Sequence, residues 1–264
     1  MTKTTFRRIM MILLACAFLL CAFVVFTVKR KYIVNDRLNR EAVNNYTTQS
    51  EETGEKDGAT KREIVLAPIK VDFKALKEIN SDIIGWIYCE DTPLNFPLVQ
   101  TTSNSFYIDH GWDGKYNPCG AAFADAVNKR DFADSNTIIY GHHLYDGSMF
   151  ASLEEWQEQE YFDEHPIMWI LTPERDYRVE LFSAYFISAY DEVYTVYPEP
   201  SEQFNEYLQK VRDLSVVTAD VELDGELKYV MLSTCAYVFA NARAIIHGMM
   251  VPVDSIGGVF APLE

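Results

Sequence analysis

Positive charge is scarce over most of the sequence. After residue 62 the chain has only 12 Lys and Arg residues against 33 Asp and Glu, whereas residues 1–62 have 11 Lys and Arg against 6 Asp and Glu. Nucleic-acid phosphates require a positive protein face, so we do not expect the acidic part to bind DNA or RNA. We interpret its charge as a source of solubility, and the basic beginning as suited to a membrane surface.

Motifs of common metal centres and internal repeats are also missing. The sequence contains neither a CxxC pair nor an HExxH motif, and His142 and His143 are adjacent, which is too close for both to hold one ion readily. No loop has the oxygen spacing that a calcium site requires. We therefore expect no metal site and no cofactor.

A long uncharged apolar run occupies residues 9–28. A helix of this length crosses a hydrocarbon core of about 30 Å. No A-x-A-like cleavage site follows it, so we expect an uncleaved signal anchor that spans the membrane once. Lipoprotein-type cleavage before Cys16 is the alternative, but it would leave a further apolar stretch that a lipid anchor does not need. Basic residues flank both ends, so charge counting does not orient the segment.

The five cysteines are an odd number, and two of them, Cys16 and Cys21, lie in the apolar run. The other three, Cys89, Cys119 and Cys235, cannot all pair within a monomer, so at least one thiol outside this run is free. Whether Cys89 and Cys119 pair depends on their Cα separation, which the sequence leaves open. An inert buried thiol is the commonest fate of a lone cysteine, but a free thiol in such a chain also suggests a nucleophile.

Residues 29–62 are interpreted as a polar linker between the apolar run and a globular body at residues 63–264. Residues 34–62 are rich in Asn, Thr, Gln, Glu and Lys and have few large apolar side chains. Such a stretch does not bury enough apolar surface to fold alone. Residues 1–8 form a short tail before the apolar run.

The body is predicted to begin with a helix. Asp72 is a plausible N-cap, Gly85 ends the element, and apolar residues recur at helical spacing between them, at Phe73, Leu76, Ile79 and Ile83. Two further helices are predicted from the apolar faces Met149, Leu153, Trp156 and Phe204, Leu208, Val211, the second with Ser201 as its N-cap.

Short strands dominate the rest of the body. Apolar or alternating runs bounded by turn residues predict strands at residues 86–89, 96–99, 137–140, 168–171, 177–182, 229–235 and 243–251. Many short strands at near-regular spacing are typical of a sandwich or a barrel. We expect a mainly β fold, a closed β-barrel with peripheral helices, preceded by one N-terminal transmembrane helix.

Three residue types suited to acyl transfer lie at predicted strand ends. Cys235 ends one strand, His142 follows Gly141 at the end of another, and Arg243 begins a third if residues 236–242 form a hairpin loop. A thiolate attacks a carbonyl while an imidazole handles the protons of the thiol and the leaving amine. An Arg stays charged and can stabilise the thiolate or an oxyanion. Each residue alone is a weak signal, because strand-end histidines and arginines are usually structural or solvated.

Together these residues lie in motifs that resemble the sortase family, and its class B branch in particular. The family's TLxTC motif corresponds to Met231-Leu232-Ser233-Thr234-Cys235, with Met in place of the first Thr, and an Arg follows shortly after. The similarity extends over residues 71–251. The stretches that carry the class B resemblance are residues 93–100, 104–107, 136–143 and 146–150.

The resemblance implies roles for individual residues. Cys235 is expected to be the nucleophile, His142 the acid and base, and Arg243 the essential arginine. Adjacent side chains of an extended strand point to opposite sides, so only one of the two neighbouring histidines should face Cys235. We expect His143 and His247 to be structural.

The same resemblance implies a groove for a sorting peptide, lined by Asn104, Ile108, Tyr140, Ser233 and Thr234. Tyr140 has an independent reason, because it adjoins His142 and offers a flat ring with a hydroxyl. Core packing explains Ile108 equally well.

The implied activity is that of a cysteine transpeptidase. It would cut a C-terminal sorting motif of secreted proteins after Thr, keep the acyl part as a thioester, and join it to an amine of a peptidoglycan precursor or cross-bridge. That chemistry requires residues 1–8 in the cytoplasm and residues 63–264 as a catalytic domain outside the cell membrane of a Gram-positive-type envelope. The alternatives are a cysteine endopeptidase that only hydrolyses, and a membrane-tethered barrel that binds peptides without catalysis.

Overall fold

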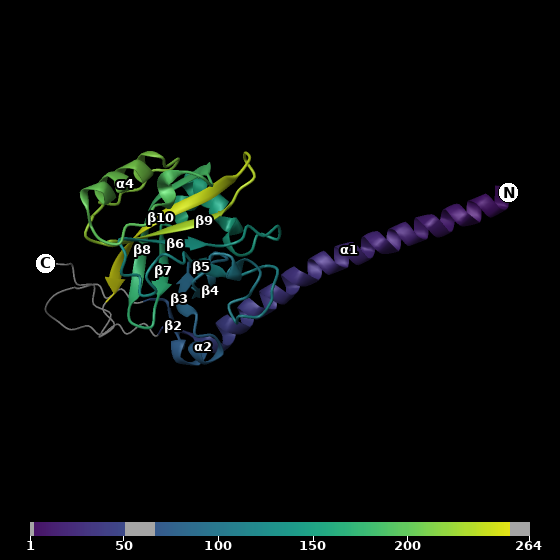
Figure 1. Cartoon of the computed structure of the whole chain (residues 1–264), viewed down its shortest axis with the longest axis horizontal. Coiled ribbons are helices and arrows are strands. Elements are labelled where there is room, and N and C mark those ends of the chain that lie inside the picture. Colours follow the sequence, from purple (N-terminus) through teal and green to yellow (C-terminus); the bar gives the residue numbers. More distant parts are fainter. Residues whose placement is uncertain (1–2, 51–66, 254–264) are drawn as a thin grey trace.

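The predicted strands form a closed barrel in the computed structural model, which describes residues 3–50 and 67–253 (Figure 1). The order around the barrel is β10-β8-β7-β3-β4-β5-β6-β9. Most neighbours are antiparallel, but β4 and β5 are parallel, as are β6 and β9. The strands are β3 (Ile83–Tyr88), β4 (Asn95–Val99), β5 (Ala122–Ala124), β6 (Asn136–Tyr140), β7 (Ile167–Leu171), β8 (Asp176–Ser188), β9 (Lys228–Cys235) and β10 (Ala242–Val253). The mainly β barrel is therefore confirmed.

The neighbouring strands β6, β9 and β10 are buried on both faces, which explains their continuous apolar runs. Alternate residues of a strand point to opposite sides. On one face Ile139, Leu232 and Ile246 belong to the cluster that fills the barrel. On the other face their neighbours pack under helix α4 (Glu202–Asp213), through Ile138, Met231, Ile245, Phe204, Leu208 and Val211.

The predicted helices are present, with one boundary wrong. Helix α2 spans Phe73–Ile79 and is capped by Asp72, whose Oδ1 accepts a hydrogen bond from the Ala75 amide at 3.0 Å. The prediction extended this helix to Gly85, but β3 starts at Ile83. A Cβ on Gly85 would lie 2.9 Å from the Leu171 carbonyl oxygen, so the glycine permits close approach of strands rather than a helix end.

Of the other two predicted helices, one is an α-helix as expected and one is a 3₁₀ helix. Ser201 caps α4 as expected, with its Oγ accepting from the Phe204 amide at 3.1 Å. The face that includes Leu153 and Trp156 belongs to a 3₁₀ helix, η2, rather than an α-helix. This 3₁₀ helix spans Phe150–Gln157.

The sequence did not predict several short elements, namely β1 (Thr47–Gln49), β2 (Ile69–Val71), η1 (Phe106–Ile108), β5, α3 (Gln159–Glu164) and η3 (Glu192–Tyr194).

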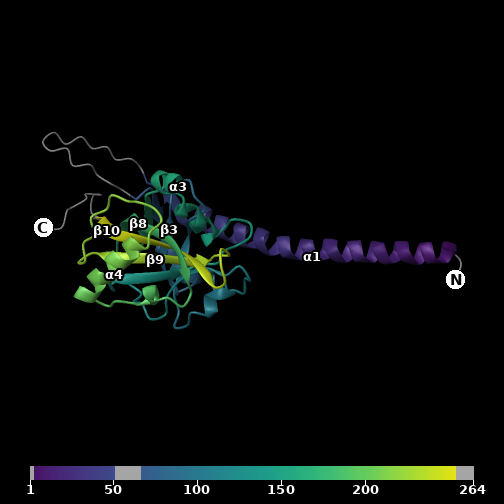
Figure 2. The ribbon, with the colours of Figure 1, turned by 90° about the horizontal axis from the view of Figure 1, so that it is seen from above.

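The apolar run lies in a single long helix, α1 (Lys3–Tyr46), which leaves the barrel as a rod (Figures 1 and 2). By length and composition it is the one helix in the described ranges that is able to cross a membrane. The linker expected at residues 29–62 is helical as far as Tyr46, and β1 then pairs with β2. Residues 51–62 and the expected domain start at residue 63 lie outside the described residues.

The last turns of α1 pack on the barrel through a narrow stripe of side chains. Ala42 is fully buried, and the Tyr46 ring meets Trp112 edge to face at 6.2 Å. Asn117 Nδ2 donates to Asn35 Oδ1 at 2.9 Å inside this contact. A polar composition therefore does not prevent a segment from docking when its few apolar groups share one helix face.

A buried histidine on β10 predicts a pH dependence of stability. His247 Nε2 lies 2.8 Å from Tyr185 Oη, and burial lowers the His247 pKa from 6.5 to about 3. Below about pH 6.5 the unfolded chain binds a proton that the folded chain excludes. The free energy of unfolding therefore decreases as the pH is lowered, by up to about 1.4 kcal/mol per pH unit. Urea unfolding of the full chain in detergent, followed by tryptophan fluorescence from neutral pH to about pH 4, measures this slope.

The matched control is the double variant His247→Phe/Tyr185→Phe, which removes the imidazole without leaving the Tyr185 hydroxyl unpaired. Its stability should fall less steeply with acid than that of the parent chain. Equal slopes in the two proteins would contradict a neutral, buried His247.

Candidate active site

The candidate residues meet at the end of the barrel where β6 and β9 finish and β10 begins. Strand β9 runs parallel to β6 with Tyr140 opposite Ser233, and antiparallel to β10 with Cys235 opposite Arg243. These two registers bring together segments that are about a hundred residues apart in the sequence.

Cys235 is half-buried at the last position of β9. Directly opposed residues of an antiparallel pair project from the same face with Cβ atoms about 5 Å apart, so Arg243 shares the face of the thiol. The Arg243 guanidinium donates to the Ala242 carbonyl at 2.9 Å, and in the described ranges no carboxylate forms an ion pair with it. A cation without an acidic partner remains available to a developing negative charge.

The other two cysteines outside α1 are unsuited to nucleophilic chemistry. Cys89 and Cys119 are both free thiols and almost fully buried, which answers the open question of their pairing. Burial raises the pKa of each thiol to about 11, so both are protonated at neutral pH. Their hydrogen bonds go to backbone carbonyls, that of Cys119 to Lys31 on α1.

The backbone before His142 is tied directly to β9. The Gly141 amide donates to the Ser233 carbonyl at 3.2 Å, and Thr234 Oγ1 donates to the Gly141 carbonyl at 2.8 Å. His142 therefore follows a residue that is bonded to both positions preceding Cys235. This arrangement brings imidazole and thiol to the same end of the barrel.

The ring of His142 contacts a loop on its other side. Its Nε2 lies 2.7 Å from the Ile108 carbonyl oxygen, and its Cδ2 lies against Gly120, where a Cβ would come within 2.8 Å. Gly120 has φ +64°, a backbone conformation that also favours glycine. No hydrogen bond joins His142 and Cys235 in the described part of the chain, and catalytic bonds often tighten only when substrate binds.

His143 contacts η2 and the loop that follows Cys235. Its Nε2 lies 3.3 Å from Glu154 Oε1 on η2, and its ring meets Tyr237 edge to face at 5.2 Å. The two neighbouring histidines thus have separate partners, and which of them faces Cys235 stays a prediction.

The predicted groove residues fall into two groups. Tyr140 and the exposed Asn104 are joined through Asp125, whose Oδ2 accepts from Tyr140 Oη at 2.9 Å and from Asn104 Nδ2 at 3.0 Å. The side chains of Ser233 and Thr234 are instead 2% exposed, with both hydroxyls bonded inside the protein.

Ile108 holds His142 through its carbonyl, while its side chain is 46% exposed. Contact of a peptide with any of the predicted groove residues stays a prediction.

Two residues of this site were not predicted from the sequence. Tyr194 stacks on Tyr140 with ring centroids 6.3 Å apart, and its Oη lies 2.9 Å from Ser233 Oγ. The Tyr194 pKa is raised, chiefly by burial and to a smaller extent by Cys235, while the Ser233 hydrogen bond and the Arg243 charge oppose the shift. This hydroxyl therefore stays neutral beside the site. Asp125 and Tyr194 lie outside the quoted motifs, and only the folding of the chain brings them to Tyr140.

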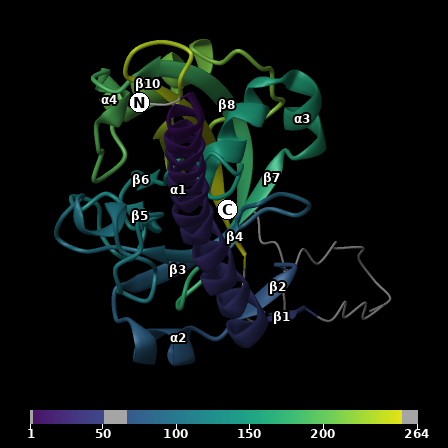
Figure 3. The ribbon, with the colours of Figure 1, turned by 90° about the vertical axis from the view of Figure 1, so that its right-hand side faces the viewer.

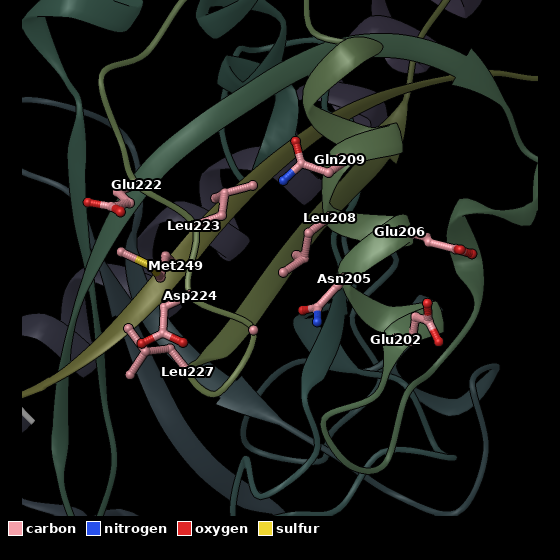
Figure 4. A pocket seen from close by; sticks show the side chains of 11 residues that line it. Glu202, Asn205, Glu206, Leu208, Gln209, Glu222, Leu223, Asp224, Leu227 and Met249 are labelled. Atoms are coloured by element: carbon pink, nitrogen blue, oxygen red, sulfur yellow. The ribbon is translucent and has the colours of Figure 1, made fainter.

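A pocket of about 730 Å³ lies elsewhere, between α4 and residues 222–227 (Figure 4). It adjoins the start of β9, at the other end of that strand from Cys235. Its lining includes the carboxylates of Glu202, Glu206, Glu222 and Asp224 and contains none of the predicted catalytic residues.

Comparison with known proteins gives a consistent result. Sortase B of Listeria monocytogenes is 33% identical over 199 residues, which cover 74% of this chain and 80% of the relative. Sortase B of Staphylococcus aureus is 29% identical over 188 residues, covering 70% and 77%. No protein-family model matches the chain.

Solved structures agree with these relatives. A Bacillus anthracis protein similar to sortase B superposes with a TM-score of 0.70 at 30% identity, covering 84% of this chain and 98% of that one. The crystal structure of Staphylococcus aureus sortase B gives 0.65 at 30% identity, covering 69% and 87%. The chain therefore belongs to the class B sortases, a family of cysteine transpeptidases.

Proposed function

We propose that this enzyme cuts a C-terminal sorting motif of secreted proteins after Thr and joins the acyl part to a cell-wall amine. The observation that carries the proposal is the pairing of Cys235 with Arg243 on adjacent strands, next to the tie between Gly141 and β9. Nucleophile, cation and imidazole then share one end of a rigid barrel, which is what acyl transfer requires.

In the first step the Cys235 thiol gives its proton to His142, and its sulfur attacks the carbonyl carbon of the Thr residue. The C–S bond forms as the electrons of the carbonyl move to oxygen, where the Arg243 guanidinium stabilises the negative charge. Collapse of this intermediate breaks the C–N bond, and His142 gives its proton to the leaving amine. A thioester between Cys235 and the sorting peptide remains.

In the second step an amine of a peptidoglycan precursor or cross-bridge attacks the thioester. His142 takes a proton from the attacking nitrogen, the new C–N bond forms, and the C–S bond breaks to release the Cys235 sulfur. Atoms and charge balance without a metal or redox group.

The partners are proposed from the relatives' structures. One solved Staphylococcus aureus sortase B is a substrate complex, and another sortase B structure is complexed with triglycine. We infer that this chain also accepts a peptide substrate and an amine. Tyr140, Asn104 and Ile108 are the proposed peptide contacts, and the buried Ser233 and Thr234 support them from beneath.

The proposed location follows from the chemistry and from α1. Residues 9–28 would cross the cell membrane once, with residues 1–8 in the cytoplasm and the barrel outside, beside the wall. Because α1 packs on the barrel, residues 31–46 would belong structurally to the catalytic domain that we placed at residues 63–264.

Single substitutions test the assignments. With the full chain in detergent and a quenched-fluorescent library of sorting pentapeptides, Cys235→Ala should abolish cleavage and His142→Ala should lower kcat/KM roughly 10²- to 10⁴-fold, because general acid–base catalysis is lost. Arg243→Gln should cost roughly 10²-fold, as removal of an oxyanion partner does. His143→Ala, the matched neighbour, should retain cleavage.

Cleavage by Cys235→Ala, or equal losses in His142→Ala and His143→Ala, would contradict these roles. A wild-type protein that binds the peptides but cuts none would favour a binding barrel.

The acceptor amine provides a separate test. Triglycine added to the cleavage reaction should divert the product from the free acid to a peptide extended by triglycine, because an amine competes with water for the thioester. Mass spectrometry of the products measures the ratio. A product that is always the free acid, at any triglycine concentration, would show a hydrolytic endopeptidase instead.

Asp125 is predicted to act on peptide binding through Tyr140 and Asn104. Asp125→Asn should raise KM roughly tenfold, because a hydrogen bond to a charged group contributes about 1.5 kcal/mol. The rate at which Cys235 is alkylated should not change. The control is Asp131→Asn, an exposed Asp that caps only its own turn through the Ala133 amide. An unchanged KM in Asp125→Asn would mean that Tyr140 and Asn104 do not contact the peptide.

A further inference from the structure

Four large side chains beside the nucleophile are exposed to solvent. Tyr237, Val238 and Phe239 lie in the β9–β10 connection and are 62%, 58% and 48% exposed. Tyr145, 79% exposed, follows β6 and stacks on Tyr237 with ring centroids 6.0 Å apart. We call these four residues the aromatic tip. Apolar residues exposed singly are common on protein surfaces, whereas a contiguous group such as this one marks an interaction site.

Helix α1 determines what lies next to this end of the barrel. The apolar run ends at Val28, and the Lys31 carbonyl already accepts a bond from the Cys119 thiol of the barrel at 3.7 Å. Three residues advance a helix by about 4.5 Å. If residues 9–28 fill the hydrocarbon core, the barrel therefore starts within the headgroup layer and has no free stalk below it.

The aromatic tip projects from the end of the barrel from which α1 leaves. Figure 1 shows the yellow β9–β10 loop on this side, and Figure 3, viewed from the same side, shows it above the emerging α1. Tyr and other amphipathic or apolar side chains concentrate at the boundary between headgroups and acyl chains.

A basic hollow completes this end. A pocket of about 620 Å³ lies between α1 and residues 113–118, and its lining includes Arg30, Lys31, Lys115 and the exposed Tyr116. Asp113 pairs with Lys115 at 3.0 Å, which leaves the charges of Arg30 and Lys31 uncompensated within the pocket. Cations at headgroup depth attract anionic lipid phosphates.

The opposite end of the barrel carries the reverse charge. The pocket near the start of β9 contains four carboxylates, from Glu202, Glu206, Glu222 and Asp224 (Figure 4). An anionic bilayer surface would repel this end and attract the basic one, so the charge distribution favours the same orientation as α1 does.

We propose that the active-site end of the barrel rests on the bilayer that α1 crosses, with the aromatic tip inserted at the interface and the basic hollow around Arg30 and Lys31 against anionic headgroups. The proposal depends on the membrane-spanning role given to α1 under the proposed function, but not on transpeptidation. It sets Cys235, two residues before Tyr237, at headgroup height. A sorting peptide and an acceptor that are both still held in the membrane would then meet the thiol without leaving the surface.

The test uses the full chain reconstituted in vesicles of phosphatidylcholine and phosphatidylglycerol, with or without brominated acyl chains that quench tryptophan on contact. Phe239→Trp and Tyr145→Trp each place one probe on the aromatic tip. Both should lose emission in brominated vesicles beyond the loss of the wild-type chain, whose four tryptophans are buried.

Val127→Trp is the matched control. Val127 is 76% exposed but lies beside the first residues of β6, at the end of that strand away from Tyr140. Its emission should be unaffected by bromination. Quenching of Phe239→Trp and Tyr145→Trp that is no greater than that of Val127→Trp would overturn the proposal.

The basic hollow and the activity have separate readouts. Quenching of Phe239→Trp should be weaker in pure phosphatidylcholine vesicles, and equal quenching in both would overturn the role of Arg30 and Lys31. Because the readout needs no peptide, a chain that inserts its tip but cuts no sorting peptide refutes only the proposed reaction. A chain that cuts peptides but leaves the tip unquenched refutes only the membrane contact.

Discussion

The pairing of β9 with both of its neighbours is the constraint on which the rest of the site depends. Its parallel register with β6 sets Ser233 beside Tyr140, and its antiparallel register with β10 sets Cys235 beside Arg243. A slip of one residue would turn Cys235 to the other face and bring a different residue opposite it. The apolar side chains of all three strands, buried on both faces, make such a slip costly, so packing of the core also secures the chemistry.

Polar contacts beneath the site restrict the conformations of the residues that form it. Thr234 holds the Gly141 carbonyl, Ser233 pairs with Tyr194, and Asp125 gathers Tyr140 and Asn104. Most of these groups are largely withdrawn from water, where an unpaired hydroxyl or carboxylate is costly, so each restricts the rotamers of its neighbour. Cys235 and His142 thereby rest on a frame of satisfied hydrogen bonds.

The position of α1 relative to the barrel follows from packing. Because α1 continues from its apolar run into contact with Trp112, Asn117 and Cys119, the barrel cannot turn freely about a flexible linker. The same contact adjoins the loop whose Gly120 and Ile108 meet His142. Helix α1, this loop and His142 thus form one connected body.

The sequence by itself determined the apolar run, most strand positions, the α4 cap and the residues proposed for catalysis, because hydrophobic period, turn residues and a short motif are local signals. It did not determine that α1 continues to Tyr46, that β3 begins at Ile83, or that Asp125 and Tyr194 join Tyr140. The packing stripe on α1 and the role of Gly85 inside β3 can be recognised only from the surfaces that these residues contact. Contacts between residues far apart in the chain leave no periodic trace in the sequence, so only the tertiary structure decided them.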